Sequence, residues 1–64
     1  MVKINGEYKD SAGMSLEEYL KEAGMEKGRI AVELNGDIVP KAKYPDTILA
    51  DGDAVEIVNF VGGG

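Results

Sequence analysis

The chain has 64 residues, which gives room for one domain with one small hydrophobic core. It contains neither cysteine nor histidine, which excludes a disulfide framework, a thiol nucleophile and the side chain best suited to proton transfer near neutral pH. Twelve acidic side chains against seven basic ones give a net charge of −5, which argues against nucleic acid as a partner and favours encounter with a basic protein surface.

The first element in chain order is predicted to be a hairpin of strands Val2–Ile4 and Glu7–Lys9. Asn5-Gly6 lies between them, and this pair favours a two-residue turn because both residues tolerate positive φ. No long apolar segment follows, neither the core of a signal peptide nor a membrane-spanning run, so we expect a cytoplasmic protein with no membrane partner.

A single short helix is predicted from about Ser15 to Ala23. Ser15 and Glu18 have the spacing of a capping box, in which each side chain accepts a hydrogen bond from the other residue's backbone N–H. Gly24 stands where a left-handed C-cap belongs. One apolar stripe with helical spacing follows the cap and comprises Leu16, Tyr19, Leu20 and Ala23.

A second hairpin is predicted from strand Ile30–Leu34, the turn Asn35-Gly36 and the short strand Asp37–Val39, which Pro40 should end. Residues 41–46 are expected to form an irregular crossover with at most one helical turn, because the residue before Pro45 is disfavoured in a helix. After a turn at 51–53, Val55–Val61 is the last predicted strand.

The last strand predicts a docking surface. Val55 and Ile57 continue the core pattern, whereas Val58 and Phe60 alternate with them and should point to the uncovered face of the sheet, where they would form a patch for a partner. Two alternatives are that a bulge returns Phe60 to the core and that these are ordinary scattered surface apolar residues.

The chain ends in three glycines, which we expect to form a flexible tail (62–64) on a folded domain (1–61). Such a tail would present the Gly64 carboxylate, with Gly62 and Gly63 giving access to a partner's active site. The alternative is a linker remnant on an ordinary small domain.

Three segments in this order are similar to the ThiS family of sulfur carriers: NGDIVP at 35–40, DGDAVEIV at 51–58 and FVGGG at 60–64. The resemblance covers nearly the whole chain. It implies an α+β, β-grasp (ubiquitin-like) fold, in which a mixed four- to five-stranded sheet packs on one helix and the first and last strands lie parallel at its centre.

The resemblance also implies a carrier rather than an enzyme. In this family a ThiF-type adenylating enzyme, similar to ubiquitin-activating enzymes, uses ATP to adenylate the terminal carboxylate, here that of Gly64. The adenylate is converted to a thiocarboxylate, whose sulfur passes to a ThiG-type thiazole synthase for thiamine. No cofactor is then bound by the chain itself.

Other interpretations remain open at this point. The same tail would serve a molybdopterin-type sulfur carrier or a ubiquitin-like modifier, and a non-covalent β-grasp interaction module would leave it inert.

The charged side chains also have two interpretations each. Acidic residues on and just after the helix could form a metal site, although a solvated face is the commoner arrangement: Glu17, Glu18, Glu22 and Glu26. Asp51 and Asp53 are interpreted as turn residues. Lys41 and Lys43 could meet acidic groups on a partner or be simple loop lysines.

Overall fold

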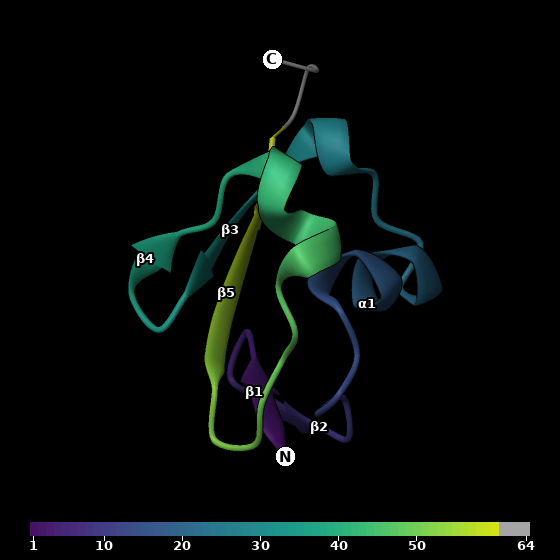
Figure 1. Cartoon of the computed structure of the whole chain (residues 1–64). Coiled ribbons are helices and arrows are strands. Elements are labelled where there is room, and N and C mark those ends of the chain that lie inside the picture. The colour runs from purple at the N-terminus through teal and green to yellow at the C-terminus, as the bar shows by residue number, and fades with distance from the viewer. Residues whose placement is uncertain (61–64) are drawn as a thin grey trace.

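A computed structural model describes residues 1–60 of the chain, and its elements form one mixed sheet with helical segments on one side (Figure 1). The elements are β1 (Val2–Ile4), β2 (Glu7–Lys9), α1 (Leu16–Glu22), the 3₁₀ segment η1 (Lys27–Arg29), β3 (Ile30–Leu34), β4 (Asp37–Ile38), the 3₁₀ segment η2 (Lys41–Asp46) and β5 (Ala54–Asn59). The strand order is β2-β1-β5-β3-β4. β1 and β5 are parallel and the other neighbours are antiparallel, which confirms the predicted α+β arrangement.

Both predicted Asn-Gly hairpins are confirmed. Asn5 and Gly6 have φ angles of 49° and 84°, and Asn35 and Gly36 have 52° and 89°. These left-handed conformations match the right-handed twist of the flanking strands, which is why two-residue turns favour this residue pair. The second returning strand is one residue shorter than predicted, although Val39 N–H still donates to the Val32 carbonyl (2.9 Å).

The capping box at the start of α1 is present as predicted. Ser15 N–H donates to Glu18 Oε1 and Glu18 N–H donates to Ser15 Oγ, both at 3.0 Å. Gly24 ends the helix with a φ of 73°. Of the predicted stripe, Leu16 and Leu20 are buried and Tyr19 packs partly against the core, whereas Ala23 is the exposed C-cap residue.

The crossover differs from the prediction, since η2 forms a six-residue 3₁₀ segment rather than at most one helical turn. A 3₁₀ helix has about three residues per turn, so η2 makes two turns with Pro45 inside. Tyr44 explains this, because its side chain is only 1% exposed and packs into the core. Burying an aromatic ring contributes enough free energy to offset a local preference against helical backbone before proline.

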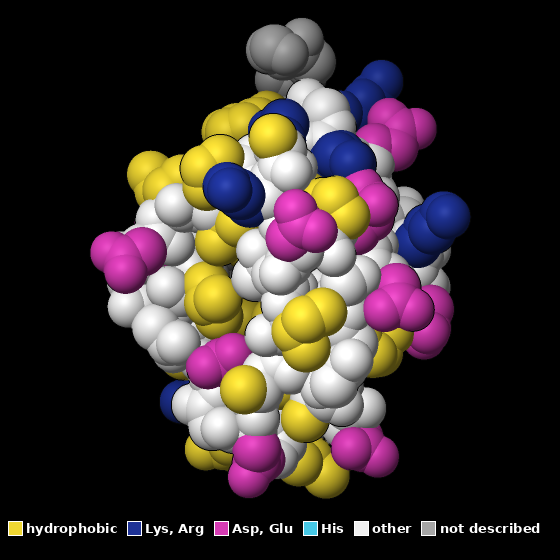
Figure 2. All heavy atoms as spheres, in the orientation of Figure 1, with side chains coloured by type: hydrophobic (Ala, Val, Ile, Leu, Met, Phe, Trp, Pro, Cys, Tyr) yellow, Lys and Arg dark blue, Asp and Glu magenta, His cyan; other side chains and the backbone are white. Residues whose placement is uncertain are grey.

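The hydrophobic core lies between the sheet and the segments α1 and η2. It contains Val2, Ile4, Leu16, Leu20, Ile30, Val32, Val39, Tyr44, Leu49, Val55 and Ile57. On the helix side, Figure 2 shows most of the visible lysine and arginine side chains in the upper half of the view, and acidic side chains both among them and over the lower half. Within residues 1–60, no helix has both the length and the apolar character needed to cross a membrane.

Candidate functional site

The candidate site begins at the end of β5. Val55 and Ile57 are buried, and the alternating Val58 is 54% exposed on the opposite face. Beyond the strand, Phe60 N–H donates to the Arg29 carbonyl (2.7 Å), which continues the β3–β5 ladder by one residue. Phe60 is 45% exposed, so the prediction that Val58 and Phe60 lie outside the core is confirmed.

The remaining predicted site residues, Gly62, Gly63 and Gly64, lie outside the described residues, as does Val61 of the predicted last strand. Phe60 is therefore the last described residue before the predicted site of modification, Gly64. The position of β5 matters for this reason. It is the central strand of the sheet, paired with β1 on one side and β3 on the other.

Sequence reasoning missed a third exposed apolar residue on the same face. Ile38 pairs with Glu33 across β3 and β4, and Glu33 pairs with Glu56 across β3 and β5. Directly opposed residues point to the same face, so Ile38 shares the face of Val58. Ile38 is 75% exposed. Ile38, Val58 and Phe60 together are called the open-face patch below.

The sequence did not reveal that Ile38 lies on this face because the face depends on how β4 pairs with β3. Asp37–Val39 is too short to show which side chains point to the core, because a shift of one residue would exchange the two faces. The observed partners Glu33 and Leu34 settle the register and leave Ile38 outside. Ala31, opposite Val58, is half-buried on the same face and extends the apolar surface between the strands.

The two turn asparagines hold β5 in place from both sides. Asn5 Nδ2 donates to the Ile57 carbonyl (3.2 Å) while Ile57 N–H donates to Asn5 Oδ1 (2.7 Å). Asn35 Oδ1 accepts from Ala54 N–H (2.9 Å), and its Nδ2 donates to Asp53 Oδ1 (3.0 Å). Each side chain continues a ladder at the point where its own strand has turned away, so backbone groups of β5 are satisfied at its start, Ala54, and at Ile57.

Most of the charged residues considered as sites have structural partners. Glu17 forms an ion pair with Lys27, Glu26 pairs with Arg29 (3.2 Å), and Glu18 caps α1. Asp53 Oδ2 accepts from Ala50 N–H (2.8 Å), a local contact that fits its interpretation as a turn residue, whereas Asp51 forms an ion pair with the distant amino terminus. Lys41 Nζ donates to the Ile30 carbonyl (2.8 Å). Residues 1–60 contain no group of three or more acidic side chains that could hold a metal ion.

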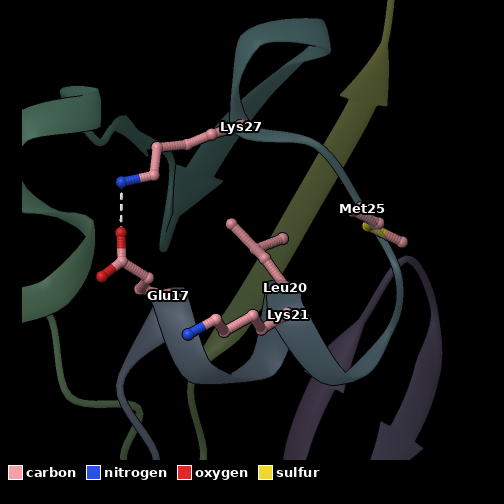
Figure 3. Close-up of a pocket in the computed structure, with 5 residues that line it drawn as sticks. All are labelled: Glu17, Leu20, Lys21, Met25 and Lys27. Carbon is pink, nitrogen blue, oxygen red and sulfur yellow. Dashed lines mark hydrogen bonds and ion pairs between the residues drawn. The ribbon is translucent and has the colours of Figure 1, made fainter.

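A shallow pocket of about 290 Å³ lies between α1 and η1, lined by Glu17, Leu20, Lys21, Met25 and Lys27 (Figure 3). The Glu17–Lys27 ion pair spans it, and Leu20 and Met25 belong to the core or pack against it. Ligand pockets usually have volumes of about 300–1,000 Å³ with several convergent polar groups. This pocket falls at the lower limit, and the carboxylate that lines it is neutralised by Lys27.

Burial perturbs the acidity of Tyr44. It raises the pKa of the Tyr44 hydroxyl above its ordinary value, and the nearby Lys27 cation partly opposes this. Tyr44 lies inside the core on the helix side of the sheet, away from the open-face patch. The pKa shift is therefore a property of the core and contributes no acid or base at the end of β5.

Comparison with known proteins decides the family. The ThiS family profile matches residues 2–64. The chain belongs to the ThiS family. The crystal structure of a ThiS thiamine biosynthesis protein from Geobacter metallireducens superimposes with a TM-score of 0.77 and 33% identity, covering 98% of this chain and 97% of that one. This ThiS structure confirms the β-grasp prediction.

Two ThiS-like relatives differ in length. The sulfur carrier protein ThiS of Thermus thermophilus is 42% identical, and the match covers 100% of both chains. The thiazole synthase of Paramagnetospirillum magneticum is 48% identical over 95% of this chain, but the match covers only 19% of that protein. The full-length family matches identify this chain as a sulfur carrier of thiamine biosynthesis, and as a carrier rather than an enzyme.

Proposed function

We propose that Gly64 carries the sulfur as a C-terminal thiocarboxylate, and that Gly62 and Gly63 lead it into the active sites of partner enzymes. The observation that carries this proposal is the family match through residue 64, together with the position of β5, the central strand, which ends at Asn59 shortly before these glycines. Glycines suit this role because a backbone without Cβ atoms passes through a narrow channel.

The chemistry requires an activating partner. A terminal carboxylate ordinarily has a pKa of about 3.3–3.7, so it is an anion at neutral pH and a poor acyl donor. An adenylating enzyme of the ThiF type would join the carboxylate oxygen to the α-phosphorus of ATP and release pyrophosphate. A sulfide-level nucleophile would then attack the acyl carbon, displace AMP and leave the thiocarboxylate. ATP is a substrate of that partner and not a ligand of this chain.

A ThiG-type thiazole synthase is the proposed acceptor of the sulfur. The thiazole synthase of Paramagnetospirillum magneticum contains a stretch similar to nearly all of this chain as 19% of its length. A carrier and the enzyme that consumes its sulfur gain effective concentration when they share one polypeptide. That relative supports the pairing of this carrier with thiazole synthase.

Docking is proposed to involve Val58 and Phe60. Both are exposed, and both are close in sequence to the tail: four residues separate Phe60 from the Gly64 carboxylate. Four residues span at most about 14 Å when extended. A partner that acts on Gly64 must therefore hold its active site close to these side chains.

Intact-mass analysis tests the proposal. The carrier is incubated with a purified adenylating enzyme, ATP and a sulfide source, and a mass gain equal to the exchange of one oxygen for sulfur at the C-terminus is expected. The matched control lacks Gly64 and should keep the unmodified mass if the enzyme requires the full tail. An unchanged mass of the full chain, with an enzyme that modifies its own native carrier, would refute the proposal.

A further inference from the structure

The strand β2 forms one edge of the sheet, beside β1. Lys3 N–H donates to the Asp53 carbonyl (2.9 Å), so the backbone groups of Lys3 face β5 and turn away from β2. Tyr8 lies directly opposite Lys3 in the β1–β2 pair. In an antiparallel pair, opposed residues alternately exchange backbone hydrogen bonds and make none. Lys3 and Tyr8 are a pair without such bonds, and the N–H and C=O of Tyr8 therefore point outward from the edge of the sheet.

The side chains of β2 are accessible as well. Tyr8 is 69% exposed, on the same face as Lys3. Glu7 and Lys9 point to the helix side, because Glu7 lies opposite the core residue Ile4. Their side chains are 74% and 43% exposed and form an ion pair with each other (3.2 Å). An accessible edge strand with outward backbone groups is a template for pairing with another strand.

The opposite edge, β4, is closed by its own chain. β4 has two residues, and Pro40, which follows shortly after it, has no N–H to donate. Val39 N–H donates to the Val32 carbonyl of β3 (2.9 Å). Two residues before Val32, the Ile30 carbonyl accepts from Lys41 Nζ (2.8 Å), which takes the place of a further strand residue. β2 is thus the edge of this sheet that is open to strand addition.

The β2 edge is complementary in charge to a second copy of itself. Glu7 and Lys9 stand on the two sides of Tyr8. When two β2 strands pair antiparallel, the outward backbone groups of one must meet the outward groups of the other, so the register can change only in steps of two residues. A register centred on the two Tyr8 residues places Glu7 of each copy opposite Lys9 of the other.

Charge selects this register over its neighbours. A shift in one direction would oppose the two Glu7 carboxylates, and a shift in the other would oppose the two Lys9 ammonium groups. Like charges directly opposed destabilise a sheet, whereas opposite charges stabilise it. The register centred on Tyr8 also lets the two Tyr8 residues exchange two N–H···O bonds and brings their rings together, and a cross-strand aromatic pair adds to stability.

We propose that two copies of this chain pair antiparallel through β2, centred on Tyr8, to form a dimer with one continuous sheet. The same residues contact each other from both sides, so the interface has two-fold symmetry and closes at two copies. β1 separates β2 from β5, and in Figure 1 β2 lies at the other end of the molecule from the end of β5. Pairing therefore leaves the end of β5 accessible in both copies, and it is independent of the proposed sulfur chemistry.

The dimer is expected to be weak and reversible. A contact between two three-residue strands is smaller than the interfaces of about 1,200–2,000 Å² that hold stable complexes together. For a Kd on the order of 1 mM, the share of chains in dimers rises from about a tenth at about 0.05 mM protein to more than half at about 2 mM. NMR spectra and translational diffusion of the full chain over this range should show shifts of the Tyr8 amide and slower diffusion.

Charge reversal gives the sharper test. Glu7→Lys and Lys9→Glu each place like charges opposite one another in a dimer, so each variant alone should have a Kd at least about tenfold higher. An equal mixture of the two variants opposes unlike charges at both positions and should associate about as well as the wild type. Both variants keep a net negative charge, so general attraction cannot explain a mixed dimer.

Glu22→Lys and Lys43→Glu serve as matched controls. They make the same charge changes at exposed positions on α1 and η2, and each should associate as the wild type does. Melting temperatures close to that of the wild type would show that all four variants are folded.

Three outcomes would overturn the inference. The first is a wild-type Tyr8 amide signal that does not shift up to about 2 mM, a range set by the expected Kd. The second is a mixture of the two β2 variants that associates no better than either variant alone. The third is a set of concentration-dependent shifts at Ile38 and Val58 in place of Tyr8, which would put the contact on the open-face patch. An unmodified mass in the sulfur-transfer experiment would refute the proposed function and leave this pairing untouched.

Discussion

Asn5 has two roles in this fold: its backbone forms part of the hairpin turn, and its side chain binds the backbone of β5. The substitution Asn5→Gly would separate these two roles. The Asn5 φ of 49° is readily adopted by glycine, so the hairpin turn should survive the substitution. The side chain is lost, and with it both hydrogen bonds to the backbone of Ile57. The change therefore removes the side-chain link between the first hairpin and β5 while leaving the turn conformation accessible.

The expected cost follows from those two partly buried bonds. A hydrogen bond contributes about 0.5–1.5 kcal/mol net, so two contribute about 1–3 kcal/mol. The added backbone freedom of glycine in the unfolded chain costs roughly another 0.4–1 kcal/mol. We expect a loss of about 2.5 kcal/mol in the free energy of unfolding, which lowers the melting temperature by about 10–20 °C in a domain of this size.

Urea and thermal denaturation measure this loss, and amide hydrogen exchange at Ile57 localises it. The matched control is Asn35→Gly, which removes two hydrogen bonds from the other turn at a φ of 52°. Its bonds are exposed, so water replaces them and the loss should be smaller. A loss for Asn5→Gly no larger than for Asn35→Gly, or unchanged exchange at Ile57, would refute the reasoning.

Three further predictions follow from the structure. Ser15→Ala should lower the free energy of unfolding by about 1 kcal/mol in urea denaturation through loss of the α1 cap; an unchanged midpoint would show that packing alone fixes the helix start. Because burial raises the pKa of the Tyr44 hydroxyl, this group loses its proton at a lower pH in the unfolded chain than in the folded one, so the free energy of unfolding should fall above pH about 10. Tyr44→Phe should remove the part of this fall that Tyr44 causes. Parallel curves of unfolding free energy against pH for the two proteins would contradict this. Phe60→Asp should leave the melting temperature nearly unchanged, because the ring is 45% exposed, but weaken docking to the adenylating enzyme; loss of folding would place Phe60 in the core.

The local features of the fold could be predicted because each depends on a few neighbouring residues. The Asn-Gly turns, the Ser15–Glu18 capping box and the Gly24 cap occur where the sequence places them. Turn and cap residues act through their own φ angles and side-chain hydrogen bonds, which require no distant partner. The resemblance of residues 35–64 to the ThiS family supplied the parallel arrangement of β1 and β5, which no local pattern would reveal.

The tertiary structure decided the features that depend on distant partners. η2 forms two turns around Pro45 because the core has room for Tyr44, and that space is created by the sheet and α1. Ile38 and the Glu33–Glu56 pair share the face of Val58 only through the register of three strands. The sequence by itself determined the turns, the caps and the alternation of β5, because these are set by short-range preferences. Only the assembled sheet determined which alternating side chains meet on its open face, because register is a relation between strands and not a property of any one of them.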